Sequence, residues 1–229
     1  MSGVLHVLQY NRHYYLASLA ILSGLIIVLR LGILPTPAGT ILLAVMAFIV
    51  VWSVGSLAAS YYIYDYAGVT RWKWLPATLP FPPRHWLNIH SGLDESTETL
   101  TQLFREARGE AVDIYDPVTM TEMSIKRARS SQSTRQPAIT ARHDSLPAPQ
   151  SSRDTIFLPL AAHEVRNADQ RVELFREVAR ILTENGQLLL AEHLRDWWNF
   201  LAFGPGCLHF QSRTEWLRVA REAGLSLND

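Results

Sequence analysis

Hydrophobic residues are concentrated in two long runs near the N-terminus of the chain. The first run covers residues 14–34 with a single charge, Arg30, and the second covers residues 38–60 with no charge. At about 1.5 Å per helical residue, each run reaches about 30 Å, the thickness of the hydrocarbon layer of a bilayer. Neither run has a polar face, as an amphipathic core helix would. The pattern predicts a transmembrane helical hairpin within residues 1–66.

The link between the two runs, residues 35–37, is too short for anything but a tight turn, so both ends of the hairpin lie on one side. Arg12 precedes the first run, and Arg71, Lys73 and Arg84 follow the second. Positive charge marks the cytoplasmic side, where we expect the termini and the domain that follows. A cleaved signal peptide, the alternative, has a shorter apolar core and no second run directly behind it.

Aromatic residues follow the second run. Four tyrosines lie within residues 61–66, and Trp72 and Trp74 come soon after. We expect these rings in the headgroup region, as an aromatic belt, with an aromatic cage for a substrate as the alternative. The proline-rich sequence in residues 67–84 predicts an extended connector.

From residue 85 onward, short apolar runs alternate with amphipathic segments. This alternation is typical of an α/β fold with a Rossmann-like, doubly wound and mostly parallel sheet. The expected strands are residues 85–90, 111–115, 154–160 and 187–192. The expected helices are one with Leu100, Leu103, Phe104 and Ala107 on one face, one over residues 169–184 that stops at Asn185 and Gly186, and one that begins with the capping box of Ser212 and Glu215. Within residues 130–153, rich in Ser, Gln, Pro and Arg, we expect a flexible excursion with one short strand at residues 138–141.

Composition narrows the choice of partners. The chain of 229 residues has 21 basic and 21 acidic residues, so it lacks the basic footprint of a nucleic-acid-binding protein. Cys207 is the only cysteine, so no internal disulfide can form.

Five landmarks in residues 86–227 occur in a characteristic order. They are Asp116 at the end of the second strand, Asp144 before Leu146 and Pro147, Asp154 at the start of the fourth strand, the helix and turn from Phe175 to Gly186, and Glu192 at the end of the fifth strand. In this order the chain resembles the class I S-adenosylmethionine-dependent methyltransferases, in particular those of the type 11-like group. The resemblance implies S-adenosylmethionine as cofactor.

The resemblance also implies roles for two of these carboxylates. Asp116 would accept hydrogen bonds from both ribose hydroxyls of the cofactor, and Asp144 one from the adenine amino group. The alternative for Asp116 is a turn residue before Pro117, and for Asp144 a loop aspartate without a ligand.

The turn after the first strand departs from the family pattern, which places several glycines there. This chain has Asn88, Ser91, Gly92 and Asp94 in that region, with Gly92 as the only glycine. We expect these four residues to line the methionine end of the cofactor site. Asp94 pairs with the positive charge of the cofactor or, alternatively, caps the next helix.

The carboxyl ends of the fourth and fifth strands carry the candidates for chemistry. His163 and Glu164 follow the fourth strand and His193 follows the fifth, so either histidine could act as a base, with an ordinary loop histidine as the alternative. A metal site built from these residues and His209 lacks tight ligand spacing, and we expect no metal. The aromatic segment 197–206 covers the active site, dips into the bilayer, or packs on the last helix.

Class I sheets finish with two further strands beyond the five expected here, so one sheet edge is left bare. Either the chain is a truncated relative of this family, or we expect a partner or the membrane to cover this edge. The sequence as a whole predicts a membrane-anchored S-adenosylmethionine-dependent methyltransferase acting on a small, lipophilic acceptor. The alternative is a non-catalytic, methyltransferase-like membrane protein that binds cofactor or serves as a scaffold.

Overall fold

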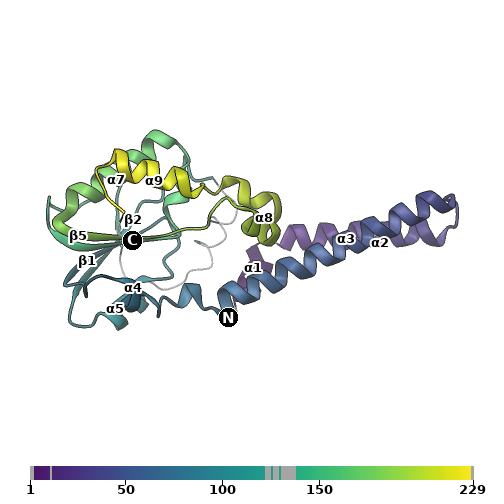
Figure 1. Cartoon of the computed structure of the whole chain (residues 1–229), viewed down its shortest axis with the longest axis horizontal. Helices are drawn as coiled ribbons and strands as arrows, with labels where there is room; N and C mark the ends of the chain where they lie inside the picture. The colour runs from purple at the N-terminus through teal and green to yellow at the C-terminus, as the bar shows by residue number, and fades with distance from the viewer. Residues whose placement is uncertain (1–2, 11, 122–124, 126–128, 130–137, 228–229) are drawn as a thin grey trace. The chain divides into compact units, whose positions relative to one another are not determined.

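The computed structural model describes residues 3–10, 12–121, 125, 129 and 138–227 (Figure 1). The chain divides into two compact units. One consists of Met1–Gly68 with Trp197–Pro205, and the other of Val69–Asp196 with Gly206–Asp229. Residues 130–137 of the expected flexible excursion lie outside the described residues.

The hairpin unit is helical throughout. Its elements are α1 (Gly3–Tyr10), α2 (Arg12–Arg30), α3 (Thr36–Ser60), the π-helix η1 (Tyr61–Tyr66) and α8 (Trp197–Phe203). The two segments Arg12–Arg30 and Thr36–Arg71 are long and apolar enough to cross a membrane, and their most apolar stretches contain no buried residue. A pair of helices inside the core of a soluble domain would be buried, so that alternative does not fit.

Polar contacts join the helices of this unit near one end of the hairpin. The hydroxyl of Tyr15 on α2 lies 3.2 Å from Ser56 Oγ on α3. The backbone N–H of Val4 donates to the Asp65 carboxylate at 2.9 Å, which ties α1 to η1. Helix α1 was not expected from the sequence, because its run of apolar residues is too short to stand out beside the two that follow.

The first part of the expected connector is folded into the second unit as a short 3-10 helix, η2 (Val69–Arg71), and α4 (Leu75–Thr78). Residues 79–84, which hold most of the proline-rich stretch expected to be extended, contain no helix or strand. Trp72 and Leu75 are buried, and the Trp72 indole N–H donates to the backbone oxygen of Glu95 at 3.3 Å. The assignment of Trp72 to an aromatic belt is therefore wrong: this ring belongs to a protein core. Exposed Tyr61, Tyr62 and Tyr66 still suit the belt.

The second unit is built on a five-stranded, entirely parallel sheet of order β3-β2-β1-β4-β5. The strands are β1 (His85–His90), β2 (Arg108–Asp113), β3 (Ile139–Thr140), β4 (Arg153–Pro159) and β5 (Leu182–Ala191). The Rossmann-like fold expected from the sequence is thus confirmed, as are β1 and the short β3. Asp154, near the start of β4, accepts hydrogen bonds from the backbone N–H groups of Arg84 and His85 and so joins the starts of β4 and β1.

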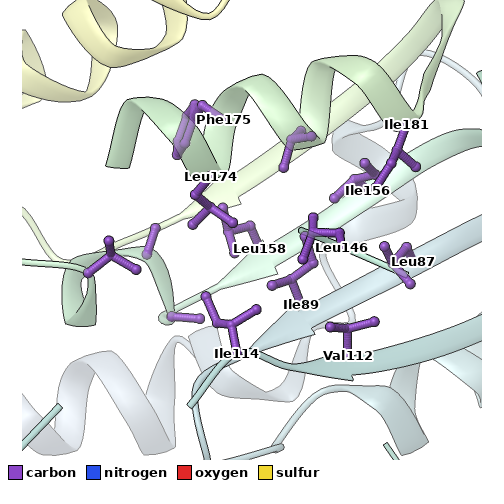
Figure 2. Close-up of a cluster of buried hydrophobic side chains, with 14 of the residues drawn as sticks. Leu87, Ile89, Val112, Ile114, Leu146, Ile156, Leu158, Leu174, Phe175 and Ile181 are labelled. Carbon is purple, nitrogen blue, oxygen red and sulfur yellow. The ribbon is translucent and has the colours of Figure 1, made fainter. Parts of the chain in front are cut away.

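Successive residues of the central strands point to opposite faces of the sheet, and both faces are covered by helices. Leu87, Ile89, Ile156 and Leu158 pack with α7 (Ala168–Ile181) and α9 (Arg213–Glu222). Figure 2 shows this cluster beneath Leu174, Phe175 and Ile181 of α7. The intervening residues Trp86 and Phe157 pack with α4 and α5 (Thr97–Leu103) on the other face (Figure 1). Burial on both faces explains why the apolar residues of these strands are not confined to alternate positions.

Several element ends differ from the expected ones. Helix α7 ends at Ile181 rather than at Glu184, because Leu182 already turns into extended conformation and the chain joins β5 through an irregular pairing with β4. Helix α5 ends at Leu103, so Phe104 and Ala107 pack on the core from beyond the helix. The capping box is present, since Ser212 Oγ accepts from the Glu215 N–H at 3.2 Å.

The second strand lies earlier in the chain than expected. It covers Arg108–Asp113 rather than residues 111–115, and Asp113 pairs with His90 in the register of β1 and β2. Asp113, not Asp116, is therefore the acidic residue that closes this strand.

Gly109 on β2 lies directly against the buried ring of Trp86. A Cβ added at Gly109 would lie 1.8 Å from Trp86 Cζ2, and the ring has no room to retreat. We expect Gly109→Ala to destabilise the domain by about 1–3 kcal/mol, the usual cost of overpacking, as measured by denaturant unfolding. Gly206→Ala is the matched control, because a Cβ there meets nothing within 4 Å. Equal stability of the two variants would contradict this packing.

Candidate functional site

The topology distinguishes the place in the sheet where β1 and β4 lie side by side. The chain leaves β1 through α5 on one face and leaves β4 through α7 on the other, while β1 and β4 are neighbours in the sheet. In doubly wound folds this switch of direction opens a crevice at the carboxyl ends of the strands, where ligands bind. The residues that follow β1, β2, β4 and β5 are therefore the ones to consider.

At the ends of β1 and β2, Asp113 organises a turn and a cation. Its Oδ1 accepts the backbone N–H of Gly92 at 2.7 Å and that of Tyr115 at 2.9 Å. Its Oδ2 pairs with the Arg129 guanidinium at 2.8 Å, and that guanidinium lies 4.1 Å from the centroid of the Tyr115 ring. His90 Nδ1 lies 3.7 Å from Asp113 Oδ1. The carboxylate thus holds the glycine turn against the end of β2.

Gly92 has to be a glycine at this point. Its φ of +80° belongs to the left-handed region, and an added Cβ would lie 2.9 Å from Arg129 Nη1 and 3.1 Å from the Tyr115 ring. The one glycine that remains of the family pattern therefore lies where a side chain would be both strained and crowded.

Three of the other expected cofactor-binding residues are occupied within the protein. Asp94 Oδ1 accepts the backbone N–H groups of Ser96 and Thr97, so it caps α5, the alternative left open by the sequence. The Asn88 amide lies 2.8 Å from Ser96 Oγ and 2.7 Å from Thr97 Oγ1, which ties β1 to the same helix end. Asp116 accepts the Val118 N–H at 2.8 Å and the Thr119 hydroxyl at 3.0 Å, and these bonds lower its pKa. Asp116 is a turn residue.

Ser91 and Asp144 complete the expected cofactor set. Ser91 is buried directly before Gly92, at the end of β1. Asp144 forms two hydrogen bonds with Arg142, at 2.8 and 2.6 Å, and they lower its pKa to about 2. Asp144 also lies near His143 and Glu173, and ligand atoms of these three side chains fall within 4.8 Å of one another. This grouping suits a cation by geometry, but Arg142 already neutralises Asp144.

At the ends of β4 and β5, a buried histidine lies between two carboxylates. His163 Nδ1 lies 2.7 Å from Glu192 Oε2, and His163 Nε2 lies 3.2 Å from Glu164 Oε1. Glu192 Oε1 also accepts the backbone N–H groups of Ala162 and His163, so one carboxylate after β5 fixes the turn after β4. Leu160 begins this turn with a φ of +50°, a conformation that non-glycine residues rarely adopt.

The electrostatics of this cluster follow from burial and pairing. Burial opposes charge on His163, but the attraction of Glu192 and hydrogen bonds with both carboxylates outweigh it and raise its pKa to about 10. Burial likewise opposes the Glu164 anion, yet pairing with His163 lowers the pKa of Glu164. Both ring nitrogens of His163 are thus engaged and its cationic form is favoured, so this arrangement does not favour the predicted role of His163 as a base, which stays a prediction.

His193 differs from His163 in charge. Burial, with repulsion from His163 and His209, lowers the pKa of His193 to about 4, so it is neutral near pH 7. Its ring centroid lies 5.1 Å from that of Phe210, which also packs edge-on against His163 at 5.7 Å. The three expected catalytic residues His163, Glu164 and His193 thus share one cluster, with His209 beside them.

Sequence reasoning missed four residues of these two clusters. Asp113 could have been preferred to Asp116, because the Asp-Pro pair that follows marks a turn rather than a strand. Glu192 was recognised as a landmark but not as the partner of His163, since the pairing of two strand ends is not visible in sequence. Nothing in the sequence signals the placement of Arg129 or Phe210.

Comparison with known proteins agrees with this geometry. Residues 88–190 match the family model described as a methyltransferase domain. These residues form a class I S-adenosylmethionine-dependent methyltransferase domain. The chain thus carries the domain of an S-adenosylmethionine-dependent methyltransferase. No curated protein matches the chain.

One solved structure is similar to this chain at a TM-score of 0.50, and others are similar to it at lower scores. A chain of the complex between the Haloferax volcanii Trm112 methyltransferase activator and a putative methyltransferase has 18% identity and a TM-score of 0.50, over 78% of this chain and 77% of that one. An Aquifex aeolicus S-adenosylmethionine-dependent methyltransferase has 14% identity and a TM-score of 0.48, over 64% and 74% of the two chains. A possible histamine N-methyltransferase from Thermotoga maritima has 18% identity and a TM-score of 0.48, over 76% and 78%.

The Asp113 carboxylate and the Gly92 turn suit the cofactor of this domain, whereas the Arg129 guanidinium occupies part of the carboxylate. A carboxylate at the end of β2, next to a turn where only glycine fits, is the acceptor that a ribose diol needs. Arg129 holds one oxygen of that carboxylate, so a ribose bound here would compete with Arg129 for Asp113 Oδ2. The Arg129 side chain is 39% exposed and can turn into solvent.

The charge on His163 makes the stability of the methyltransferase domain depend on pH. Because its pKa rises from 6.5 to about 10 on folding, the stabilisation is complete below pH 6.5 and is lost as the pH rises through 10. Between pH 7 and pH 10, we expect the Tm of the wild type to fall by about 4 °C more than that of His163→Asn. Scanning calorimetry of both proteins at both values measures this. Equal losses of Tm would show that His163 is not the group responsible.

Proposed function

We propose that this protein is a membrane-anchored methyltransferase that methylates a small, lipophilic acceptor on the cytoplasmic side of a bilayer. The observation that carries the proposal is the presence, in one chain with a methyltransferase domain, of two helical segments that are long and apolar enough to cross a membrane and contain no buried residue in their most apolar stretches. Exposed apolar surface of this extent calls for a nonaqueous surrounding. A bilayer offers one and also dissolves an apolar acceptor.

In this proposal Asp113 holds the cofactor. Bound S-adenosylmethionine supplies a methyl group activated by its sulfonium charge. The Asp113 carboxylate accepts the ribose hydroxyls when Arg129 releases Oδ2, and Gly92 lets the backbone come close to the cofactor. Asp113 thereby takes the role that the family resemblance implied for Asp116.

The cluster at β4 and β5 serves the acceptor. Glu192 orients His163, and the His163 cation holds Glu164 through Oε1. Glu164 Oε2 is buried and has no hydrogen-bond partner among the described residues, so it is the oxygen suited to a donor from outside the protein. We assign it to the O–H or N–H of the acceptor: the carboxylate takes the proton as the acceptor atom bonds to the methyl group.

Asp113→Ala tests the cofactor site. We expect the affinity for S-adenosylmethionine to fall at least about tenfold, for the loss of a charge-assisted hydrogen-bond pair. Asp116→Ala is the matched control, a carboxylate three residues away in the same loop, and should bind within about twofold of the wild type. Isothermal titration calorimetry of full-length protein in detergent measures both. A loss confined to Asp116→Ala would return the ribose site to the position expected from the sequence.

The anchor and the acceptor class are tested together in membranes. We expect the protein to stay in the membrane fraction through an alkaline carbonate wash, and a variant with Ile27→Arg and Val51→Arg to be released, because a charge at the helix centre costs about 3 kcal/mol. Labelled methyl groups from S-adenosylmethionine should then enter the organic-solvent extract of those membranes, with Asp113→Ala as the inactive control.

Release of the wild type by the wash would overturn the anchor. Methyl label recovered only in the aqueous phase would overturn the lipophilic acceptor and leave the anchor standing. The two parts of the proposal therefore fail separately.

A further inference from the structure

Between β5 and α9 the chain makes an excursion whose two ends are hydrogen-bonded to each other. Its residues are divided between the two compact units. Leu194 and Gln211 form a parallel bridge, and the Arg195 N–H donates to the Gln211 oxygen at 2.9 Å. The residues between them, 195–210, contain α8 and the 3-10 helix η4 (Gly204–His209). We call residues 195–210 the α8 excursion. Its base lies in the methyltransferase unit, whereas Trp197–Pro205 belong to the hairpin unit.

Helix α8 packs on α3. The Phe200 ring meets the Trp52 ring edge-on with centroids 5.6 Å apart, and Trp52 Nε1 is the nearest neighbour of a Cβ built on Gly204, at 3.8 Å. Trp52 lies eight residues before the end of α3, about 12 Å along the helix. If residues 38–60 span the membrane, the end of α3 lies at the boundary between headgroups and acyl chains, and Trp52 lies about 12 Å below it. A helix that lies about 5–10 Å into the bilayer can contact Trp52 at that depth.

The outward surface of α8 is aromatic and uncharged. Trp197 and Trp198 are 67% and 78% exposed, and Leu208 is 62% exposed. Residues 197–208 contain no charged side chain, and Arg195 and Asp196 precede them. Exposed tryptophans in an uncharged segment are typical of segments that lie in the membrane interface.

The base of the α8 excursion lies beside the cluster at the ends of β4 and β5. We call its residues His163, Glu164 and His193 the acceptor cluster. His193 lies four residues before Trp197, and Phe210, which packs on His163 and His193, ends the excursion. An extended chain spans at most about 3.5 Å per residue, so His193 stays within about 14 Å of Trp197 whatever the arrangement of the two units. A bilayer contact at α8 therefore holds the acceptor cluster close to the lipid.

We propose that the α8 excursion is a third membrane contact, in which Trp197 and Trp198 insert at the boundary of headgroups and acyl chains and bring the acceptor cluster to lipids of that leaflet. The inference rests on the proposed membrane anchor, because α8 packs on the helix that would span. The partner surface is the bilayer itself. The acceptor class is sharpened to molecules whose reactive group lies at the headgroup boundary.

Site-specific quenching tests this contact in the full-length protein. Cys207, the only cysteine, is replaced by serine, and single cysteines are introduced as Trp198→Cys, Val51→Cys or Val118→Cys and labelled with an environment-sensitive fluorophore. Val51 on α3 is 70% exposed and reports the anchor, and Val118 in the methyltransferase unit is 81% exposed and reports the aqueous surface. The proteins are reconstituted in phosphatidylcholine vesicles with spin-labelled lipids.

We expect the label at position 198 to be quenched at least about threefold more by a spin label near the headgroups than the label at position 118, since interfacial segments reach about 5–10 Å into the bilayer. Aqueous iodide should show the reverse order. The label at position 51 should respond to spin labels deep in the acyl chains. Trp197→Cys is the second variant, and calorimetric binding of S-adenosylmethionine checks that each labelled protein is folded.

Quenching at position 51 without quenching at positions 197 and 198 would overturn the inference and leave the anchor intact. Absence of quenching at position 51 would overturn the anchor, and the inference with it. The two failures are therefore distinguishable.

Discussion

The acceptor side of the methyltransferase domain depends on the contact between Glu192 and His163. Both side chains are buried, and moving either charge out of water alone would be prohibitive. Each is stabilised because the other is present and because Glu192 also accepts two backbone N–H groups of the turn after β4. The pair therefore fixes the ends of two neighbouring strands together and, through His163, sets the orientation of Glu164.

At the ends of β1 and β2, where we propose that the cofactor binds, Asp113 takes the place that Glu192 has in the other cluster, but its ion pair is weaker. Asp113 accepts two backbone N–H groups from the loops after β1 and β2, just as Glu192 accepts two from the loop after β4. Its remaining partner, however, is a surface arginine rather than a buried histidine. An exposed ion pair of this kind contributes little to stability, so it can be exchanged for the hydroxyls of a ligand. The acceptor side is locked by charge, whereas the cofactor side remains open to exchange.

Much of the fold could be predicted from the sequence because it depends on local patterns. The strand at residues 85–90, the capping box at Ser212 and the two apolar runs are signals carried by neighbouring residues, and the structure has each of them. The predicted end of the second strand at Asp116 and the predicted aromatic-belt position of Trp72 were wrong for a different reason. Whether Asp113 or Asp116 closes β2 depends on the register with β1, and whether Trp72 faces lipid or a core depends on packing against Trp86 and Leu100. Pairings across many residues leave no local trace.

The α8 excursion runs from the methyltransferase unit into the hairpin unit and back. This path bears on how a membrane anchor would act on the domain. A hairpin joined to an enzyme by one flexible link would only raise the local concentration of the domain near the bilayer. Here the chain enters the hairpin unit a second time at Trp197 and returns to the methyltransferase unit at Gly206, so three chain crossings join the two units. Because the crossing at Trp197 comes four residues after His193, that residue of the acceptor cluster stays within about 14 Å of the hairpin unit.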